Sequence, residues 1–239
     1  MRDSSEPPTL LRINRHDEAA QLICFGSVVA LGGGHQYARF VNRFRGTYCS
    51  SVLSAPGFLP GQRLPSTMGP LLEYHAEEVL DRLGGDRPLV LLGSSSGGTV
   101  AHGVAAELER RGVRPAAVVL LDTYLSDNRA MTQFNDVLLG GMFDREDQAV
   151  PMDGTRLTAM GKYFRILDDY RPPQVAAPVL LVRAASPLGD AAPAIGDWRS
   201  SWPGAHTVID VAGDHFSMME RHVETTAGAV SDWLASILA

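Results

Sequence analysis

Three consecutive serines, Ser94 to Ser96, stand between an apolar run and a helix-like segment in the stretch LVLLGSSSGGTVAHG. Only Ser95 has one glycine two places before it and another two places after it, which is the G-x-S-x-G pattern of a nucleophile elbow. On so sharp a strand-to-helix turn, neighbouring segments approach too closely for side chains at the two glycines. The same letters also describe an ordinary Gly/Ser-rich loop. Ser95 is therefore a candidate nucleophile that needs partners elsewhere in the chain.

The first partner to look for is an acid. A serine hydroxyl needs a base to take its proton and an acid to hold that base in the correct tautomer. Asp122 ends the apolar run AAVVLLD, the next predicted strand after the one that precedes Ser95. Both residues are therefore expected at the same carboxyl edge of a parallel sheet. Asp190, in the loop after the later run PVLLVRA, is the alternative acid, and we favour Asp122.

The second partner is a base, and the sequence offers 7 histidines. His215 lies in VAGDHFSMM, a turn between the last predicted strand and the last predicted helix, from which an imidazole can reach over the edge of the sheet. It also completes the chain order of serine, acid and histidine. The remaining histidines stand at less suitable places, namely His16, His35, His75, His102, His206 and His222. Asp214 beside His215 is interpreted as a turn former.

Acyl transfer also needs two backbone N–H groups aimed at the developing oxyanion. One is expected from Ser96, directly after the candidate nucleophile. The other is expected from Ser27, which follows Gly26 in the loop after the first central strand. These residues would form the oxyanion hole.

The elements that must position these residues alternate along the chain. Short apolar runs bounded by turn residues alternate with segments of helical period, which predicts an α/β fold with a mostly parallel sheet flanked by helices. Their content of Val, Ile and Leu indicates burial on both faces. Helices are expected over 66–83, with Ser66 as the cap, over a segment ending at Gly112, and at the end of the chain. The predicted strands span residues 22–29, 50–55, 88–93, 116–122, 178–184 and 206–211, with 9–13 as a weaker edge candidate.

The segment 123–175 is too long for a simple connection between strands, and long insertions are usually lids or binding elements. Apolar residues recur in it at helical spacing in two places, first Met131, Phe134, Leu138 and Leu139, then Leu157, Met160, Phe164 and Leu167. These faces would either dock on the body or line a channel for a long apolar substrate. For the channel we expect contacts from Tyr124, Phe134, Leu138 and Tyr163.

Composition limits the classes of protein. A chain of 239 residues that is 45% apolar can bury one large core, so we expect one domain over 1–239. A formal net charge of -6, with no long basic run, argues against nucleic-acid and membrane partners. Cys24 and Cys49 form no metal-binding pattern, and the N-terminus lacks an apolar signal core. We therefore expect a soluble cytoplasmic protein that needs no cofactor.

These residues together resemble the thioesterase domains that end modular type I polyketide synthases, which have an α/β-hydrolase fold with a helical lid. LICFGSVVALGG is similar to the family's oxyanion-loop segment, VVLLDTY to its acid-bearing strand and AGDHFSMM to its histidine loop. APGFLPGQRLPSTM resembles its proline- and glycine-rich stretch, and MFDREDQAVPMDGTRLTAMGKY its lid. The likeness covers most of the chain. The short separation of Ser95 and Asp122 is also typical of this family rather than of stand-alone editing thioesterases.

The resemblance implies a two-step release reaction of antibiotic-type polyketide biosynthesis. Ser95 would take the chain from the phosphopantetheine arm of an acyl carrier protein, and His215 would then activate water or a hydroxyl of the chain. The product would be a free acid or a macrolactone. The alternatives are a type II editing thioesterase or lipase-like esterase, and a binding module, which would normally have lost a member of the triad.

Two features depart from the family pattern. The family usually has a histidine directly before the nucleophile, where this chain has Ser94. That histidine is not a triad member, so we expect catalysis to survive. Residues 1–8, MRDSSEPP, cannot form the apolar helices with which related domains dimerise. We expect a monomer or a weak homodimer.

Overall fold

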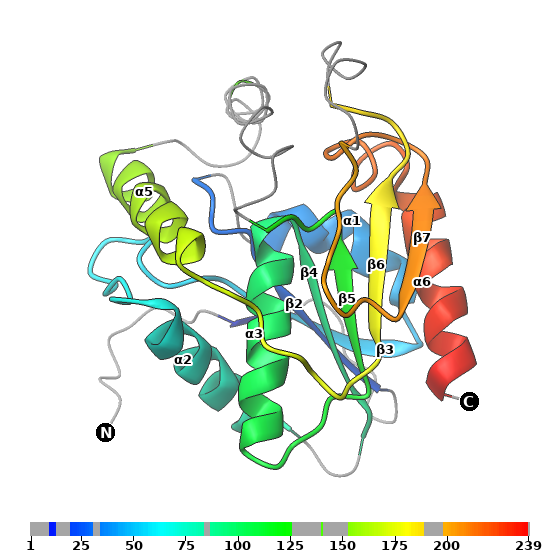
Figure 1. The fold of residues 1–239 in the computed structure, drawn as a ribbon, viewed down its shortest axis with the longest axis horizontal. Coiled ribbons are helices and arrows are strands. Elements are labelled where there is room, and N and C mark those ends of the chain that lie inside the picture. The colour runs from blue at the N-terminus through cyan, green and yellow to red at the C-terminus, as the bar shows by residue number, and fades with distance from the viewer. Residues whose placement is uncertain are drawn as a thin grey trace.

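The fold is built on a 7-stranded sheet with helices on both faces (Figure 1). The structure, a computed structural model, describes residues 10–12, 20–30, 34–83, 87–125, 140, 153–188 and 198–238. Its strands are β1 (Leu10–Arg12), β2 (Ala20–Phe25), β3 (Tyr48–Leu53), β4 (Leu89–Ser94), β5 (Ala117–Leu121), β6 (Val179–Ala184) and β7 (Thr207–Val211). They lie in the order β1-β3-β2-β4-β5-β6-β7, and every pair is parallel except β1 with β3. The parallel strands therefore end at one common edge, as the sequence predicts.

Helices cover both faces of the sheet. One layer contains α2 (Met68–Leu80) and α3 (Ser96–Arg110), and the buried residues of α5 (Gly154–Asp168) extend the core of this layer. The opposite layer contains the 3₁₀ helices η1 (Gly34–Tyr37) and η2 (Asn42–Phe44), with α1 (Ala38–Val41) and α6 (Val223–Leu238). In Figure 1, α3 lies in front of the central strands and α6 runs beside β7 at the C-terminal end.

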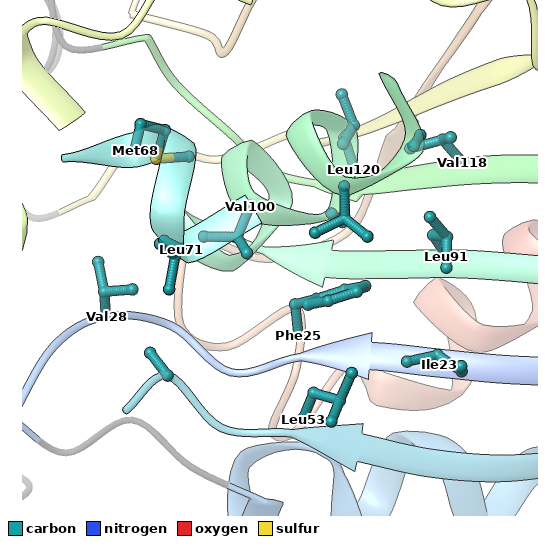
Figure 2. Close-up of a cluster of buried hydrophobic side chains, with 14 of the residues drawn as sticks. Ile23, Phe25, Val28, Leu53, Met68, Leu71, Leu91, Val100, Val118 and Leu120 are labelled. Atoms are coloured by element: carbon teal, nitrogen blue, oxygen red, sulfur yellow. The ribbon is translucent and has the colours of Figure 1, made fainter. Parts of the chain in front are cut away.

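The central strands are buried on both faces, which confirms the prediction from their composition. In β2, Ile23 and Phe25 pack in the α2 and α3 layer, whereas Leu22 and Cys24 pack in the opposite layer. This alternation is the period of two that a strand imposes on its side chains. Figure 2 shows Phe25 on the side of the sheet that Leu71 of α2 and Val100 of α3 cover.

Every predicted strand overlaps an observed one, and the largest difference is at β2. The predicted strand 22–29 is too long, because β2 ends at Phe25. The N–H of Gly26, directly after the strand, still donates to the carbonyl of Leu53 on β3. Val28 and Ala30 beyond it are both fully buried. These two apolar residues are buried in a loop. In the sequence, a buried apolar loop cannot be distinguished from a buried strand by periodicity alone.

Helix ends followed the sequence only in part. The prediction that Ser66 caps its helix is wrong, because α2 begins at Met68 and its N-cap is Thr67, which makes no side-chain capping bond. Ser66 stands one position too early. The helix before Gly112 behaves as expected, since α3 ends at Arg110 and Gly112 has a φ of +82°, which favours glycine.

Of the inserted segment 123–175, the structure describes residues 123–125, 140 and 153–175. Helix α5 covers the second predicted helical stretch, and the predicted face is confirmed in part, because Met160 is buried and Phe164 and Leu167 are partly buried against the core. Leu157 is 41% exposed, whereas the buried residues are Arg156, Ala159, Met160, Tyr163 and Ile166. Met131, Phe134, Leu138 and Leu139 lie outside the described residues. No helix in the described part of the chain is long and apolar enough to cross a membrane.

Candidate active site

Ser95 lies on the turn between β4 and α3, as the elbow motif predicts. Its backbone has φ 55° and ψ -131°, a conformation that costs energy in any residue with a Cβ. The turn is fixed from both sides, because the Ser95 N–H donates to the Leu121 carbonyl at 2.8 Å and its carbonyl accepts from the Gly98 N–H at 3.0 Å. The first bond joins the elbow directly to β5.

The glycines around Ser95 are required by close backbone contacts. A Cβ on Gly93 would lie 2.1 Å from the Gly97 carbonyl oxygen, and one on Gly97 would lie 2.3 Å from that of Phe25. A Cβ on Gly98 would lie 1.9 Å from the Thr123 hydroxyl oxygen. These contacts confirm the steric reason given for the first two glycines. The need for Gly98 was not predicted, because its contact comes from the end of β5.

Asp122 and His215 are brought together at the same edge. Their carboxylate Oδ2 and imidazole Nδ1 are 2.8 Å apart, and Asp122 directly follows β5 with a φ of 43°. Among the described residues, Asp122 and Ser95 are the non-glycine residues with positive φ. Such strained backbone commonly accompanies functional sites. With the Nδ1 proton donated to the carboxylate, the neutral ring keeps Nε2 as its acceptor.

Several donors hold the Asp122 carboxylate in place. Its Oδ1 accepts from the Ala184 N–H at 3.1 Å and from the Ser200 hydroxyl at 3.0 Å. Its Oδ2 accepts from the Tyr124 hydroxyl at 3.4 Å in addition to facing His215. The residue is 1% exposed, so these bonds are needed to keep a carboxylate in the interior. The sequence offered no signal for Ser200, which comes from a distant loop.

His215 lies on the turn after β7, and Asp214 shapes that turn. The Asp214 carboxylate accepts from the N–H groups of Phe216 at 3.1 Å and Ser217 at 2.8 Å. The Ser217 hydroxyl accepts in return from the Asp214 N–H. Burial raises the pKa of Asp214, but the bonds from Ser217 and Phe216 outweigh it and leave this pKa lowered. These bonds match the expected role of Asp214 as a turn former.

Three of the competing histidines have other surroundings in the described part of the chain. His75 and His102 are 1% and 2% exposed, and burial lowers their pKa values to about 3 and about 4. His206 accepts through Nδ1 from the Val179 N–H at the edge of the sheet. His16 and the alternative acid Asp190 are outside the described residues.

The loop after β2, residues 26–30, lies beside the elbow, as expected for an oxyanion loop. The Ser27 hydroxyl donates to the Ser94 carbonyl at 2.9 Å, and the Val28 N–H donates to the Ser96 hydroxyl at 3.0 Å. The Ser27 N–H, the predicted oxyanion donor, donates to Gln36 Oε1 at 3.2 Å. Gln36 Nε2 donates to the Ser27 hydroxyl at 3.1 Å. Gln36 was missed because it stands on η1, in a different element.

Ser94, directly before the candidate nucleophile, is part of a buried backbone network. Its N–H donates to the Tyr37 hydroxyl at 2.8 Å, and that hydroxyl donates to the Phe25 carbonyl at 2.7 Å. Tyr37 is fully buried, and burial raises its pKa well above the usual value. The Tyr37 hydroxyl therefore joins the ends of β2 and β4 on the side of the sheet opposite α2 and α3.

The predicted channel residues have different surroundings. The single proton of the Tyr124 hydroxyl can be donated either to Asp122 Oδ2 at 3.4 Å or to the Trp198 carbonyl at 3.3 Å, so this residue lies at the site. The Tyr163 ring is fully buried and stacks on Phe58 with the ring planes 4° apart. Its hydroxyl donates to the Pro56 carbonyl at 2.7 Å, so Tyr163 packs as a core residue and presents no channel surface. Phe134 and Leu138 lie outside the described residues.

Comparison with known proteins places this fold and site in a family. A family model described as Thioesterase domain matches residues 20–234. The chain therefore belongs to the family of thioesterase domains. It is 42% identical over 222 residues to polyketide synthase GfsE of Streptomyces halstedii, a match that covers 92% of this chain and 6% of that protein.

A second relative is erythronolide synthase EryA3 of Saccharopolyspora erythraea, 37% identical over 215 residues, with 89% of this chain and 7% of that protein covered. The chain thus spans only a small part of the length of these relatives. Among solved structures, a Vlm2 thioesterase domain is 20% identical with a TM-score of 0.67, covering 94% of this chain and 96% of that one. YbtT, a type II thioesterase, is 17% identical with a TM-score of 0.69, covering 96% and 100%. These likenesses confirm the predicted α/β-hydrolase fold.

Proposed function

We propose that this chain releases a polyketide from an acyl carrier protein, with Ser95, Asp122 and His215 as its catalytic triad. The observation that carries the proposal is the 2.8 Å contact of Asp122 with His215, at the sheet edge where the strained elbow presents Ser95. The similarity to parts of polyketide synthase GfsE and erythronolide synthase EryA3 supports the polyketide substrate and the carrier-protein partner. The two free cysteines, Cys24 and Cys49, support a cytoplasmic location.

The first step forms an acyl-enzyme. His215 Nε2 takes the proton of the Ser95 hydroxyl as the serine oxygen attacks the thioester carbonyl carbon. The developing oxyanion accepts from the Ser96 N–H and from the Ser27 N–H, once the substrate has displaced Gln36 from Ser27. The intermediate collapses, the C–S bond breaks, and the imidazolium gives its proton to the leaving thiolate.

The second step releases the chain. His215 takes a proton from water or from a hydroxyl of the acyl chain, and the new oxygen attacks the ester carbonyl carbon. Collapse returns the proton to Ser95 and gives a free acid or a macrolactone. The product depends on whether water or a hydroxyl of the acyl chain is positioned at the ester carbonyl, because His215 can activate either nucleophile. No cofactor is needed for either step.

Synthetic acyl thioesters test the proposal. The chain should release thiol from a pantetheine thioester of a long hydroxyacyl group, and the product mass should identify an acid or a lactone. Intact-protein mass should show an acyl adduct that Ser95→Ala lacks and Ser94→Ala keeps. Preference for acetyl over long chains would instead indicate an editing thioesterase. Absence of both turnover and fluorophosphonate labelling would indicate a binding module.

A further inference from the structure

Helix α5 of the inserted segment is bonded to the oxyanion loop through Ala30. The Ala30 N–H donates to Met160 Sδ at 3.4 Å, and the Ala30 carbonyl accepts from Arg156 Nε at 2.5 Å. Arg156 and Met160 are one helical turn apart and therefore lie on the same face of α5. Both backbone groups of one loop residue are thus bonded to one helix.

The Arg156 side chain is unusual for a residue that only docks a helix. It is 7% exposed, and burying a cation costs free energy unless polar partners replace water. Ala159 and Ile166 bury the same helix face without that cost. Burial lowers the pKa of Arg156, which the Asp153 carboxylate partly opposes, and a guanidinium remains protonated at neutral pH. Arg156 therefore donates a hydrogen bond to the Ala30 carbonyl, which a buried apolar residue at this position could not do.

Arg156 is itself fixed from several directions. Its Nη1 donates to the Phe58 carbonyl at 3.4 Å, and its guanidinium carbon lies 5.5 Å from the centre of the Phe58 ring. Its backbone N–H donates to the Asp153 side chain at 2.9 Å, which caps the start of α5. The guanidinium therefore joins three parts of the chain, namely α5, the loop after β3 and the oxyanion loop.

We propose that Arg156 and Met160 are positioning residues of the oxyanion loop, an inference that rests on the proposed function. The near end of the loop is fixed by Gly26 on Leu53 and by Val28 on Ser96. Ala30 is the attachment of the loop to α5, and Ser27 lies between Gly26 and Val28. A displacement of Ala30 would therefore reach the Ser27 N–H through Val28, so the placement of α5 influences the alignment of this donor. The inserted segment thus contributes to the chemical step and does more than cover the site.

The test compares Arg156→Met, Arg156→Lys and Met160→Leu with Lys162→Met. Lys162 is on the same helix, but its ammonium donates to the Ser66 carbonyl and not to the loop. With active sites titrated by a fluorophosphonate, Arg156→Met should lower kcat for a long acyl thioester by about tenfold with KM nearly unchanged, because a small misplacement of an oxyanion donor costs rate rather than affinity. Met160→Leu should lower kcat less. Arg156→Lys should restore most of the loss.

Amide hydrogen exchange measures how well the backbone of the oxyanion loop is held, and it does not depend on catalytic turnover. Residues 26–30 should exchange faster in Arg156→Met and Met160→Leu than in the wild type or Lys162→Met, at a temperature where all four remain folded. Wild-type exchange of 26–30 in Arg156→Met and Met160→Leu, or a kcat loss equal to that of Lys162→Met, would overturn the inference. A wild-type protein without thioester turnover would overturn the proposed function instead, while the exchange result would still decide whether α5 holds the loop.

Discussion

The elbow and the oxyanion loop lie side by side but are held by different means. Ser95 is fixed by backbone bonds and by glycines that leave no space for a Cβ. Residues 26–30 are fixed largely by side chains from elsewhere, namely Gln36, Ser96, Arg156 and Met160. The nucleophile is therefore placed by the fold itself, whereas the oxyanion donor is placed by contacts that can be removed one at a time. Substitutions should have near-total effects in the first region and graded effects in the second.

The largest effect should come from Ser95→Ala. Removing the nucleophile should lower kcat by about 10⁶-fold, as in other serine triads, with little change in stability. Steady-state thiol release and circular dichroism measure the two quantities. Ser94→Ala is the matched control, because Ser94 makes its described bonds through its backbone. If only Ser94→Ala failed to form an acyl-enzyme, the nucleophile would be Ser94 and not Ser95.

Asp122→Asn should rank second. The amide would favour the wrong tautomer of His215, and the expected loss in kcat is about 10⁴-fold. Asp190→Asn should change the rate little. Steady-state kinetics of the two variants decide between the acids, and the reverse ranking would assign the role to Asp190.

Two glycine substitutions compare the elbow with α5 directly. Gly97→Ala would place a Cβ 2.3 Å from the Phe25 carbonyl oxygen, so we expect a strong loss of both stability and activity. Gly161→Ala on α5 meets nothing within 4 Å and should raise the free energy of unfolding by about 0.5–1 kcal/mol, since glycine is a poor residue inside a helix. Thermal unfolding measures both. A tolerated Gly97→Ala would contradict the steric account of the elbow.

Among the changes at the elbow, Ser96→Ala should reduce the rate only moderately. This change keeps the backbone N–H that serves as oxyanion donor but removes the hydroxyl that accepts from Val28. We expect kcat to fall by less than about tenfold, because donor misplacement costs less than donor loss. A drop as large as that of Asp122→Asn would mean that the Ser96 hydroxyl takes part in the reaction.

The two regions also differ in how well the sequence predicts them. Gly93, Ser95 and Gly97 act within one short stretch, so their spacing alone indicates the turn and its function. Asp122 and His215 follow from the order of strands in a parallel sheet. The role of each of these residues can be predicted from the sequence because it depends on local backbone geometry or on the end of a strand.

The residues that were missed act through side-chain contacts with another element of the fold. Arg156 on an amphipathic segment is typical of a solvent-facing residue, and only the folded structure shows its contact with Ala30. Gln36 gives no local signal for its bond to Ser27. Leu157 was expected on the buried face, but it is 41% exposed, and its neighbour Arg156 is buried instead. The hydrophobic periodicity of the sequence predicts helices and strands, but it does not predict which side chains of separate elements form hydrogen bonds with each other.

The attachments of α5 also matter for recombination between related domains. A chimera that exchanges only the segment 123–175 would take α5 away from the loop after β3, whose Pro56 and Phe58 carbonyls accept from Tyr163 and Arg156. The stacked rings of Phe58 and Tyr163 would then come from different parents. The unit that should be inherited intact is therefore discontinuous and consists of residues 26–58 together with 153–168. Crossovers that respect this unit should give active chimeras more often than crossovers at the ends of the insertion.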